Sequence, residues 1–217
     1  MTDGTDTRFR AIPIGTWERR ELFRFYAGFA NPNYNVSVAL DAREIFRFAK
    51  ERGESFFLLA CFAVAKALNA VPAMRLRFLD DERVAEYAVV HPSCPLAREG
   101  SELFVQALLP YRPTFAEFRA SAAPIVESVR RGNAPAETGD GLPNIFCASC
   151  VPWFSATGTS AADFAFNQAE QILTWFKMTP AGEITLSGRF NHCFTDGVHL
   201  GAFFNGVAAN FARPETL

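Results

Sequence analysis

The sequence predicts an α/β (α+β) fold in which helices cover a mixed β-sheet. Segments with the two-residue period of strands and segments with the 3.6-residue period of amphipathic helices are about equally frequent. Several strand-like segments also follow one another near the C-terminus, an order typical of a mixed sheet covered by helices. Because the 217 residues are 49% apolar and include 23 phenylalanines, we expect one domain over residues 1–217 with an aromatic-rich core.

The N-terminal half opens on a polar stretch, and residues 1–12 are expected to form a loose arm. Helix signals follow it: Asp41 and Ser55 precede apolar runs as N-caps, and Gly53 and Pro72 end them. Alternating apolar residues mark the strands between these helices. The expected elements are a helix over 16–26 that Thr16 could cap, a strand over 34–40, helices over 41–52 and 56–69, and a hairpin of strands 74–78 and 83–90.

The C-terminal half contains most of the expected strands. Thr114 and Glu117 fit a capping box at the start of a helix that should end before Gly132. The stretch 132–143 is rich in alanine, glycine and proline and is expected to be a loop, with no domain boundary because strands continue on both sides. The expected elements are strands over 103–109, 145–151, 171–178 and 183–192, and helices over 115–131 and 197–211.

The junction between the last strand and the last helix is the first candidate for chemistry. His192 ends the strand, and Asp196 opens the helix four residues later, where its carboxyl group could cap the first turn. A histidine there could act as a general base, since imidazole exchanges a proton near neutral pH. The alternative is a core histidine beside an ordinary helix cap. The pattern by itself does not choose between them.

Cysteine and arginine residues offer weaker candidates. Cys147 and Cys150 are three residues apart on one strand, so they face opposite sides and cannot hold one metal ion; we expect no metal site. Cys193 should point away from the neighbouring histidine and pack as a thiol rather than act as a nucleophile. Arg19 and Arg20 would point about 100° apart on a helix, so one could turn inward. The alternative is that both are solvated.

Charge and composition exclude several function classes. The net charge of −2 and the pI near 6.0 give no electrostatic reason to expect a nucleic acid or an anionic membrane as partner. The longest apolar run, Phe56–Ala65, is too short to span a bilayer, and the N-terminus is unlike a secretory signal. Five cysteines scattered through apolar segments suggest reduced thiols. We therefore expect a cytoplasmic protein.

Four blocks of residues resemble one known family over almost the whole chain. The pattern His-x-x-x-Asp-Gly alone is shared with dihydrolipoamide acyltransferase domains and with condensation domains of peptide synthetases. The blocks are Trp17-x-Arg19-Arg20-x-x-Phe23-x-Phe25-Tyr26, Asp80-Asp81-Glu82, Ser149-x-x-Pro152-Trp153 and His192-x-x-x-Asp196-Gly197-x-His199. In this order and spacing they resemble the chloramphenicol acetyltransferase family.

The resemblance implies an architecture and a reaction. The fold would be a two-layer sandwich of mixed sheet and helices, assembled as a homotrimer with each active site at a subunit interface. Acetyl-coenzyme A would be the co-substrate. His192 would match the catalytic base that removes the proton of the acceptor hydroxyl, and Ser149 the hydroxyl that stabilises the tetrahedral oxyanion. Losing such an oxyanion donor typically raises the barrier by about 3 kcal/mol.

Five further residues match positions with supporting roles in this family. Arg19 and Asp196 would match a buried ion pair that holds the His192 segment, which makes the aspartate a structural partner rather than a charge-relay acid. Thr174 matches a residue that helps to solvate the transition state. Tyr26 and Phe104 match acceptor-pocket positions.

Departures from the family pattern concern mostly the acceptor. Asn191 and Thr195 replace a frequent histidine and cysteine, but neither position carries the chemistry. Smaller residues stand where the family supplies bulky ones, at 134–136 and 158–161, and the turn at 27–32 also differs. We expect an O-acetyltransferase with chloramphenicol as the leading acceptor and antibiotic inactivation as its role. The alternatives are an enzyme acting on another alcohol and a non-catalytic trimer that binds a hydrophobic small molecule.

Overall fold

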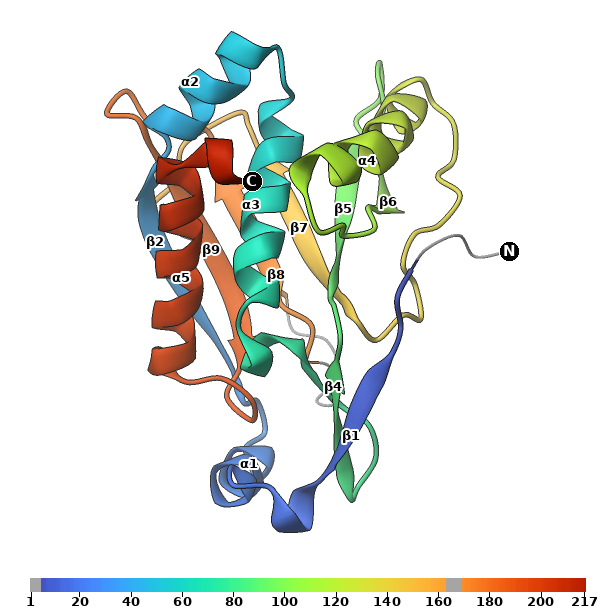
Figure 1. Cartoon of the computed structure of the whole chain (residues 1–217), viewed down its shortest axis with the longest axis vertical. Coiled ribbons are helices and arrows are strands. Elements are labelled where there is room, and N and C mark those ends of the chain that lie inside the picture. Colours follow the sequence, from blue (N-terminus) through green and yellow to red (C-terminus); the bar gives the residue numbers. More distant parts are fainter. Residues whose placement is uncertain (1–4, 163–168) are drawn as a thin grey trace.

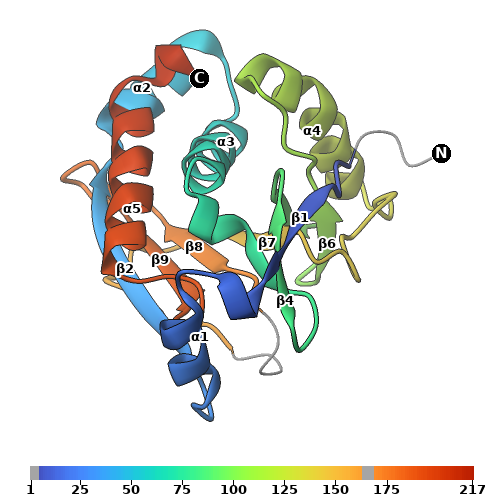
Figure 2. The same cartoon turned by 60° about the horizontal axis from the view of Figure 1, so that its bottom comes forward.

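A six-stranded mixed sheet forms the centre of the protein, with the strand order β2-β9-β8-β7-β5-β6. The structure, a computed structural model, describes residues 5–162 and 169–217. Helices cover one face of this sheet, and the opposite face carries no helix among the described residues (Figures 1 and 2). The mixed α/β fold is thereby confirmed. The strands are β2 (Asn33–Asp41), β5 (His91–Ala97), β6 (Phe104–Leu108), β7 (Ile145–Val151), β8 (Ile172–Phe176) and β9 (Glu183–Asn191).

The helical layer packs the main core against the sheet. Its helices are α2 (Arg43–Arg52), α3 (Phe56–Asn69), α4 (Phe115–Arg130) and α5 (Gly197–Ala212). Helix α3 is apolar on nearly all sides and lies between its neighbours, so most of its side chains are buried. Its start is stabilised by Ser55, whose hydroxyl accepts the N–H of Leu58 at 3.4 Å, and α4 begins with the expected capping box of Thr114 and Glu117.

A second, three-stranded sheet corrects one expectation. Its strands are β1 (Phe9–Pro13), β3 (Leu76–Phe78) and β4 (Arg83–Tyr87), and β1 pairs along its whole length with β4. Residues 9–12 are therefore not a loose arm. The carbonyl of Asp6 also accepts the side-chain N–H of Asn144 at 2.7 Å, so residue 6 is fastened to the body as well. Residues 1–4 lie outside the described part.

Two further elements differ from the sequence prediction. Helix α1 spans Arg20–Ala27 and is preceded by a 3-10 turn at Ile14–Thr16, so Thr16 does not cap it. Strand β5 was missed because Pro92 and Pro95 lie within it, and proline is a poor strand signal. Strand β5 matters for the site, since it forms one border of a gap in the sheet.

Candidate active site

His192 lies just after β9 and is held between two aromatic rings. Its backbone N–H donates to the carbonyl of Pro32 at 2.9 Å. Its imidazole stacks on Tyr26 of α1, with centroids 4.4 Å apart, and on Tyr34 of β2, with centroids 3.9 Å apart. The side chain remains 31% exposed. The ring is therefore fixed in orientation while one edge stays accessible.

Arg19 clamps the segment that carries this histidine. Its guanidinium donates to the carbonyl oxygens of His192 at 2.9 Å and Cys193 at 3.0 Å, and to both carboxylate oxygens of Asp196. The pair bridges residues 177 positions apart, and Arg19 is the arginine that turns inward. Its side chain is 11% exposed, against 31% for Asp196. The hydrogen bonds from Arg19 hold the pKa of Asp196 below its ordinary value, so the carboxylate stays charged at neutral pH.

The carboxylate also determines which imidazole nitrogen can accept a proton. Nδ1 of His192 is buried and lies 3.4 Å from Oδ1 of Asp196. A negative charge beside Nδ1 favours the tautomer that carries its hydrogen on Nδ1. The lone pair is then on Nε2, at the accessible edge of the ring. This arrangement suits a general base.

The turn from β9 into α5 is locked by its own polar groups. The hydroxyl of Tyr34 donates to the carbonyl of Thr195 at 3.1 Å, and the Thr195 hydroxyl donates to the carbonyl of Asn191 at 3.0 Å. Nδ1 of His199 accepts the backbone N–H of Asp196 at 3.0 Å. Burial, reinforced by the charge of Arg19, lowers the pKa of His199, which keeps that ring neutral. Sequence reasoning missed Tyr34 as a site residue, because an aromatic residue in a strand is an ordinary core signal.

Ser149 and Thr174 lie side by side on the face of the sheet that no helix covers within residues 5–162 and 169–217. They are direct partners between β7 and β8, and Thr174 in turn pairs with Ser187 of β9. The row continues to Ser37 of β2, whose hydroxyl lies 2.8 Å from that of Ser187. Hydroxyl groups thus cross four neighbouring strands on this face. At the β9 end the row is covered, since Ser187 is buried and its hydroxyl accepts the backbone N–H of Thr159 at 3.2 Å. Ser149 and Thr174 are only half-buried, so their hydroxyl groups remain available to a ligand.

A gap in the sheet opens directly beside Ser149. Strand β5 pairs with β7 only as far as Ser93, whereas β7 continues beside β8 to Val151. Pro95 of β5 has no N–H to donate to a neighbouring strand, which favours the separation of β5 from β7 beyond Ser93. A cavity of about 530 Å³ occupies the gap, and Phe104 of β6 borders it together with Ser149. Its other walls are mostly apolar, with Phe56, Phe57, Val126 and Trp153 among them.

The predicted catalytic residues do not meet within one chain. Ser187 of β9 is level with Ser149 two strands away, and His192 follows five residues later. With about 4.8 Å between strands and about 3.3 Å per residue, His192 lies on the order of 20 Å from Ser149. The structure instead forms two half-sites. One half-site unites His192, Arg19, Asp196 and Tyr26; the other unites Ser149, Thr174 and Phe104.

Burial raises the pKa of the thiols of Cys147, Cys150 and Cys193, so each is held in its protonated form at neutral pH. Cys193 is fully buried, and burial raises its pKa to about 11. Cys147 pairs with Ile172 and Cys150 with Trp175, so the two cysteines occupy opposite faces of β7, as predicted. Within residues 5–162 and 169–217, no three His, Cys, Asp or Glu side chains come together as a metal site would require.

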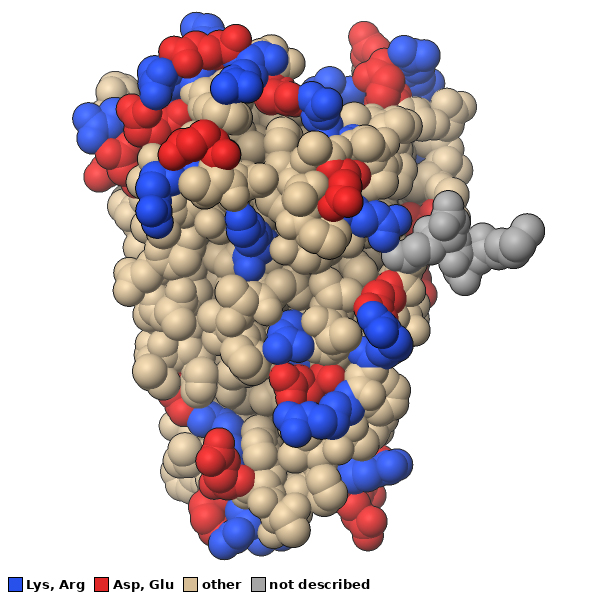
Figure 3. Space-filling view, viewed as in Figure 1, with Lys and Arg blue, Asp and Glu red and all other residues tan. Residues whose placement is uncertain are grey.

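The face of the molecule seen in Figure 3 carries both basic and acidic side chains. Basic and acidic side chains are interspersed at both ends and down the right half of this view, and the largest uncharged area lies left of its centre. None of the helices in the described ranges is both long and apolar enough to cross a bilayer.

Comparison with known proteins places the chain in a family. A family model described as chloramphenicol acetyltransferase matches residues 7–208. A chloramphenicol acetyltransferase of Streptomyces acrimycini is 26% identical over 210 residues, which cover 95% of this chain and 96% of that relative. A solved chloramphenicol acetyltransferase structure, also 26% identical, covers 93% of this chain and 99% of its own with a TM-score of 0.85.

More distant structures share the fold alone. A probable dihydrolipoamide acetyltransferase of Listeria monocytogenes is 19% identical, with a TM-score of 0.63 over 93% of this chain and 94% of its own. The family match spans nearly the whole chain and includes both half-sites. The protein therefore belongs to the chloramphenicol acetyltransferase family and is an acyltransferase of that family.

Proposed function

We propose that the protein moves an acetyl group from acetyl-coenzyme A to a hydroxyl group of a small molecule, at an active site completed by two copies of the chain. The observation that supports this proposal is the distance between His192 and Ser149 within one chain. A base and an oxyanion donor must lie within hydrogen-bond reach of the same reacting group. The His192 half-site of one copy facing the Ser149 half-site of the next meets that requirement.

Exposed aromatic side chains around both half-sites support such an assembly. Phe25 and Phe29 on and after α1 are 60% and 44% exposed near the histidine, and Phe104 and Trp153 are 65% and 72% exposed near Ser149. These are two different patches, so joining them is a head-to-tail contact, and such a contact forms a ring when the rotation between copies closes. We propose that the ring is the homotrimer that the family resemblance implies.

The chemistry follows from the two half-sites. Nε2 of His192 accepts the proton of the acceptor hydroxyl while the oxygen of that hydroxyl attacks the thioester carbonyl. The Ser149 hydroxyl, with Thr174 beside it, donates a hydrogen bond to the carbonyl oxygen as negative charge develops there. His192 then returns the proton to the departing thiolate. Arg19 and Asp196 hold the ring and its tautomer throughout, without exchanging a proton.

Chloramphenicol is the leading acceptor, because it is the substrate named for the relatives. The gap cavity beside Ser149 has apolar walls that suit the flexible arm of a thioester or an aromatic acceptor. Acetyl-coenzyme A and five free cysteines both agree with a cytoplasmic location.

Mixing two inactive variants tests the shared active site. His192→Ala keeps its Ser149 half-site, and Ser149→Ala keeps its His192 half-site. When the two variants are co-expressed at equal levels and assemble at random, about one interface in four joins an intact His192 half-site to an intact Ser149 half-site. About a quarter of wild-type activity should therefore return. Each variant alone, and the two mixed after separate purification without subunit exchange, are the controls. Co-expressed variants that stay as inactive as either parent would contradict a site shared between chains.

A further inference from the structure

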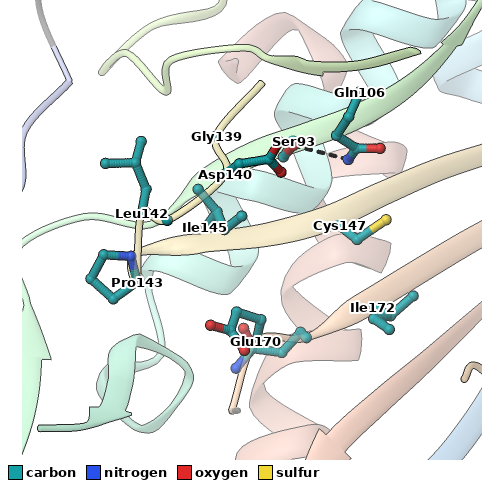
Figure 4. Close-up of a pocket in the computed structure, with 12 residues that line it drawn as sticks. Ser93, Gln106, Gly139, Asp140, Leu142, Pro143, Ile145, Cys147, Glu170 and Ile172 are labelled. Atoms are coloured by element: carbon teal, nitrogen blue, oxygen red, sulfur yellow. Dashed lines mark hydrogen bonds between the residues drawn. The ribbon is translucent and has the colours of Figure 1, made fainter. Parts of the chain in front are cut away.

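A second cavity, of about 550 Å³, adjoins the Ser149 half-site on the face of the sheet that carries Ser149 (Figure 4). It is lined by Cys147 and Ile172, which lie two residues before Ser149 and Thr174 on the same strands and the same face. Two residues along a strand span about 7 Å. An acceptor whose reacting hydroxyl lies at Ser149 can therefore extend into this cavity with the rest of its structure.

Gln106 of β6 lines the same cavity, and hydrogen bonds fix the direction in which its amide points. The hydroxyl of Ser93 donates to the carbonyl of Thr138 at 2.7 Å, because a carbonyl oxygen can only accept. The Ser93 oxygen must then accept from Gln106, whose Nε2 lies 2.9 Å away. In Figure 4 the amide nitrogen of Gln106 points to Ser93, and the amide oxygen points away from it.

The amide nitrogen of Gln106 also lies beside the thiol of Cys147. Burial raises the pKa of this thiol, and a hydrogen bond from Gln106 offsets part of the rise, which means that the amide donates toward the sulfur. Ser93 and Cys147 thus engage the nitrogen, and the Oε1 atom is the part of the amide that remains. Oε1 has no partner within residues 5–162 and 169–217, and it is not closed off from solvent. A ligand in the cavity can therefore reach it.

The other long polar side chains around the cavity are less available to a ligand. Gln171 uses both ends of its amide, since Nε2 donates to a backbone carbonyl at 3.0 Å and Oε1 accepts from Arg77 at 3.2 Å. Asp140 lies at the exposed rim, where water competes for its carboxylate, and the Oε2 atom of Glu170 is buried. Gln106 is therefore the lining residue that presents a neutral, accessible acceptor in a fixed direction.

We propose that Gln106 is a specificity-determining residue, whose Oε1 accepts a hydrogen bond from a second donor group of the acceptor, a hydroxyl or an amide N–H apart from the reacting hydroxyl. This inference rests on the proposed acetyl transfer and identifies a residue that selects its acceptor. Strand β5 separates Gln106 from Ser149, so their backbones lie on the order of 10 Å apart, a span that the glutamine side chain shortens. Chloramphenicol carries both kinds of donor, an amide N–H and a second hydroxyl, and therefore meets the requirement.

The test compares chloramphenicol with two analogues on wild type and on Gln106→Met. One analogue lacks the second hydroxyl, and the other carries a methyl group in place of the amide hydrogen. Thiol release from acetyl-coenzyme A gives kcat/KM for each. Wild type should favour chloramphenicol over at least one analogue by about tenfold, since a site that hydrogen-bonds a donor rejects the molecule that lacks it. Methionine matches the length of glutamine without its amide, so Gln106→Met should remove that preference, mainly by raising KM for chloramphenicol.

A second variant and a control complete the comparison. Ser93→Ala keeps Gln106 but removes the hydroxyl that fixes its amide, so the preference should fall by a smaller factor, about threefold. Asn205→Leu removes an amide from the exposed side of α5 and should leave the preference unchanged. Melting curves confirm that each variant is folded. A preference that survives both Gln106→Met and Ser93→Ala would overturn the inference, and so would an equal loss for chloramphenicol and both analogues.

Calorimetric titration without acetyl-coenzyme A separates this inference from the proposed function. Preferential binding of chloramphenicol that is lost in Gln106→Met supports the role of Gln106 even if no ester forms, and the missing ester would count against acetyl transfer only. Acetylated chloramphenicol with an unchanged preference in Gln106→Met would overturn the inference and keep the acetyltransferase. Chloramphenicol that neither binds nor reacts would count against both.

Discussion

Asp196→Asn should loosen the His192 segment while nearly preserving its shape. Asparagine keeps one acceptor oxygen but loses the charge that pairs with Arg19. Breaking a fully buried ion pair costs about 3–5 kcal/mol, whereas an exposed pair is worth at most about 1 kcal/mol. Here Arg19 is 11% exposed and Asp196 31% exposed, so the pair lies between these limits. We expect the free energy of unfolding to fall by about 2 kcal/mol.

Arg19→Met should cost more, because it also removes the hydrogen bonds to the carbonyls of His192 and Cys193. At about 1 kcal/mol for each bond, the total loss is about 4 kcal/mol. The double variant leaves neither charge unpaired. Its loss should therefore be smaller than the sum of the single losses by about 1–2 kcal/mol.

Denaturant unfolding of the four proteins measures this coupling, and thiol release measures turnover. Turnover of Asp196→Asn should fall about ten- to hundredfold and should not recover in the double variant, since the anchor and the tautomer of His192 are both lost. Glu127→Gln breaks an exposed pair with Arg131, 51% and 71% exposed, and serves as the control with a loss below about 0.5 kcal/mol. The ion pair would not hold the His192 segment if the losses in unfolding free energy of the two single variants simply added in the double variant. A loss for Asp196→Asn no larger than that of Glu127→Gln would contradict it as well.

Three further predictions concern catalysis and pH. His192→Ala should lower turnover by about two to four orders of magnitude with an unchanged melting curve; steady-state rates within tenfold of wild type would exclude it as the base. Ser149→Ala should lower kcat about a hundredfold with little change in KM, since its hydrogen bond strengthens only in the transition state; an effect on KM alone would indicate a binding role. Burial lowers the pKa of His91 and of His199, so the unfolded chain binds more protons below about pH 6.5 and stability should fall as the pH drops from 7 to 5. Urea midpoints measured across that range check this, and a slope unchanged in His91→Gln would contradict the contribution of His91.

Local chemistry in the sequence was sufficient to predict most elements. Ser55, the Thr114–Glu117 box and Gly53 mark helix ends through their own short-range hydrogen bonds and backbone preferences, and all three act as expected. The two missed strands have a common cause. Strand β1 lacks a buried face, and β5 contains two prolines, so each is a strand only because a partner elsewhere in the chain pairs with it.

The catalytic candidates could be chosen from the sequence, through their resemblance to a family, and so could the pairing of Arg19 with Asp196. The positions of these residues relative to one another could not be predicted from the sequence. Periodicity indicates which side of an element is buried, but it does not say which other element covers it or how far two strands lie apart. Hence only the tertiary structure places His192 between two tyrosines and on the order of 20 Å from Ser149. Sheet register likewise aligns Ser149, Thr174 and Ser187 on one face, because long-range pairing, and not the order of residues, decides which side chains share a face.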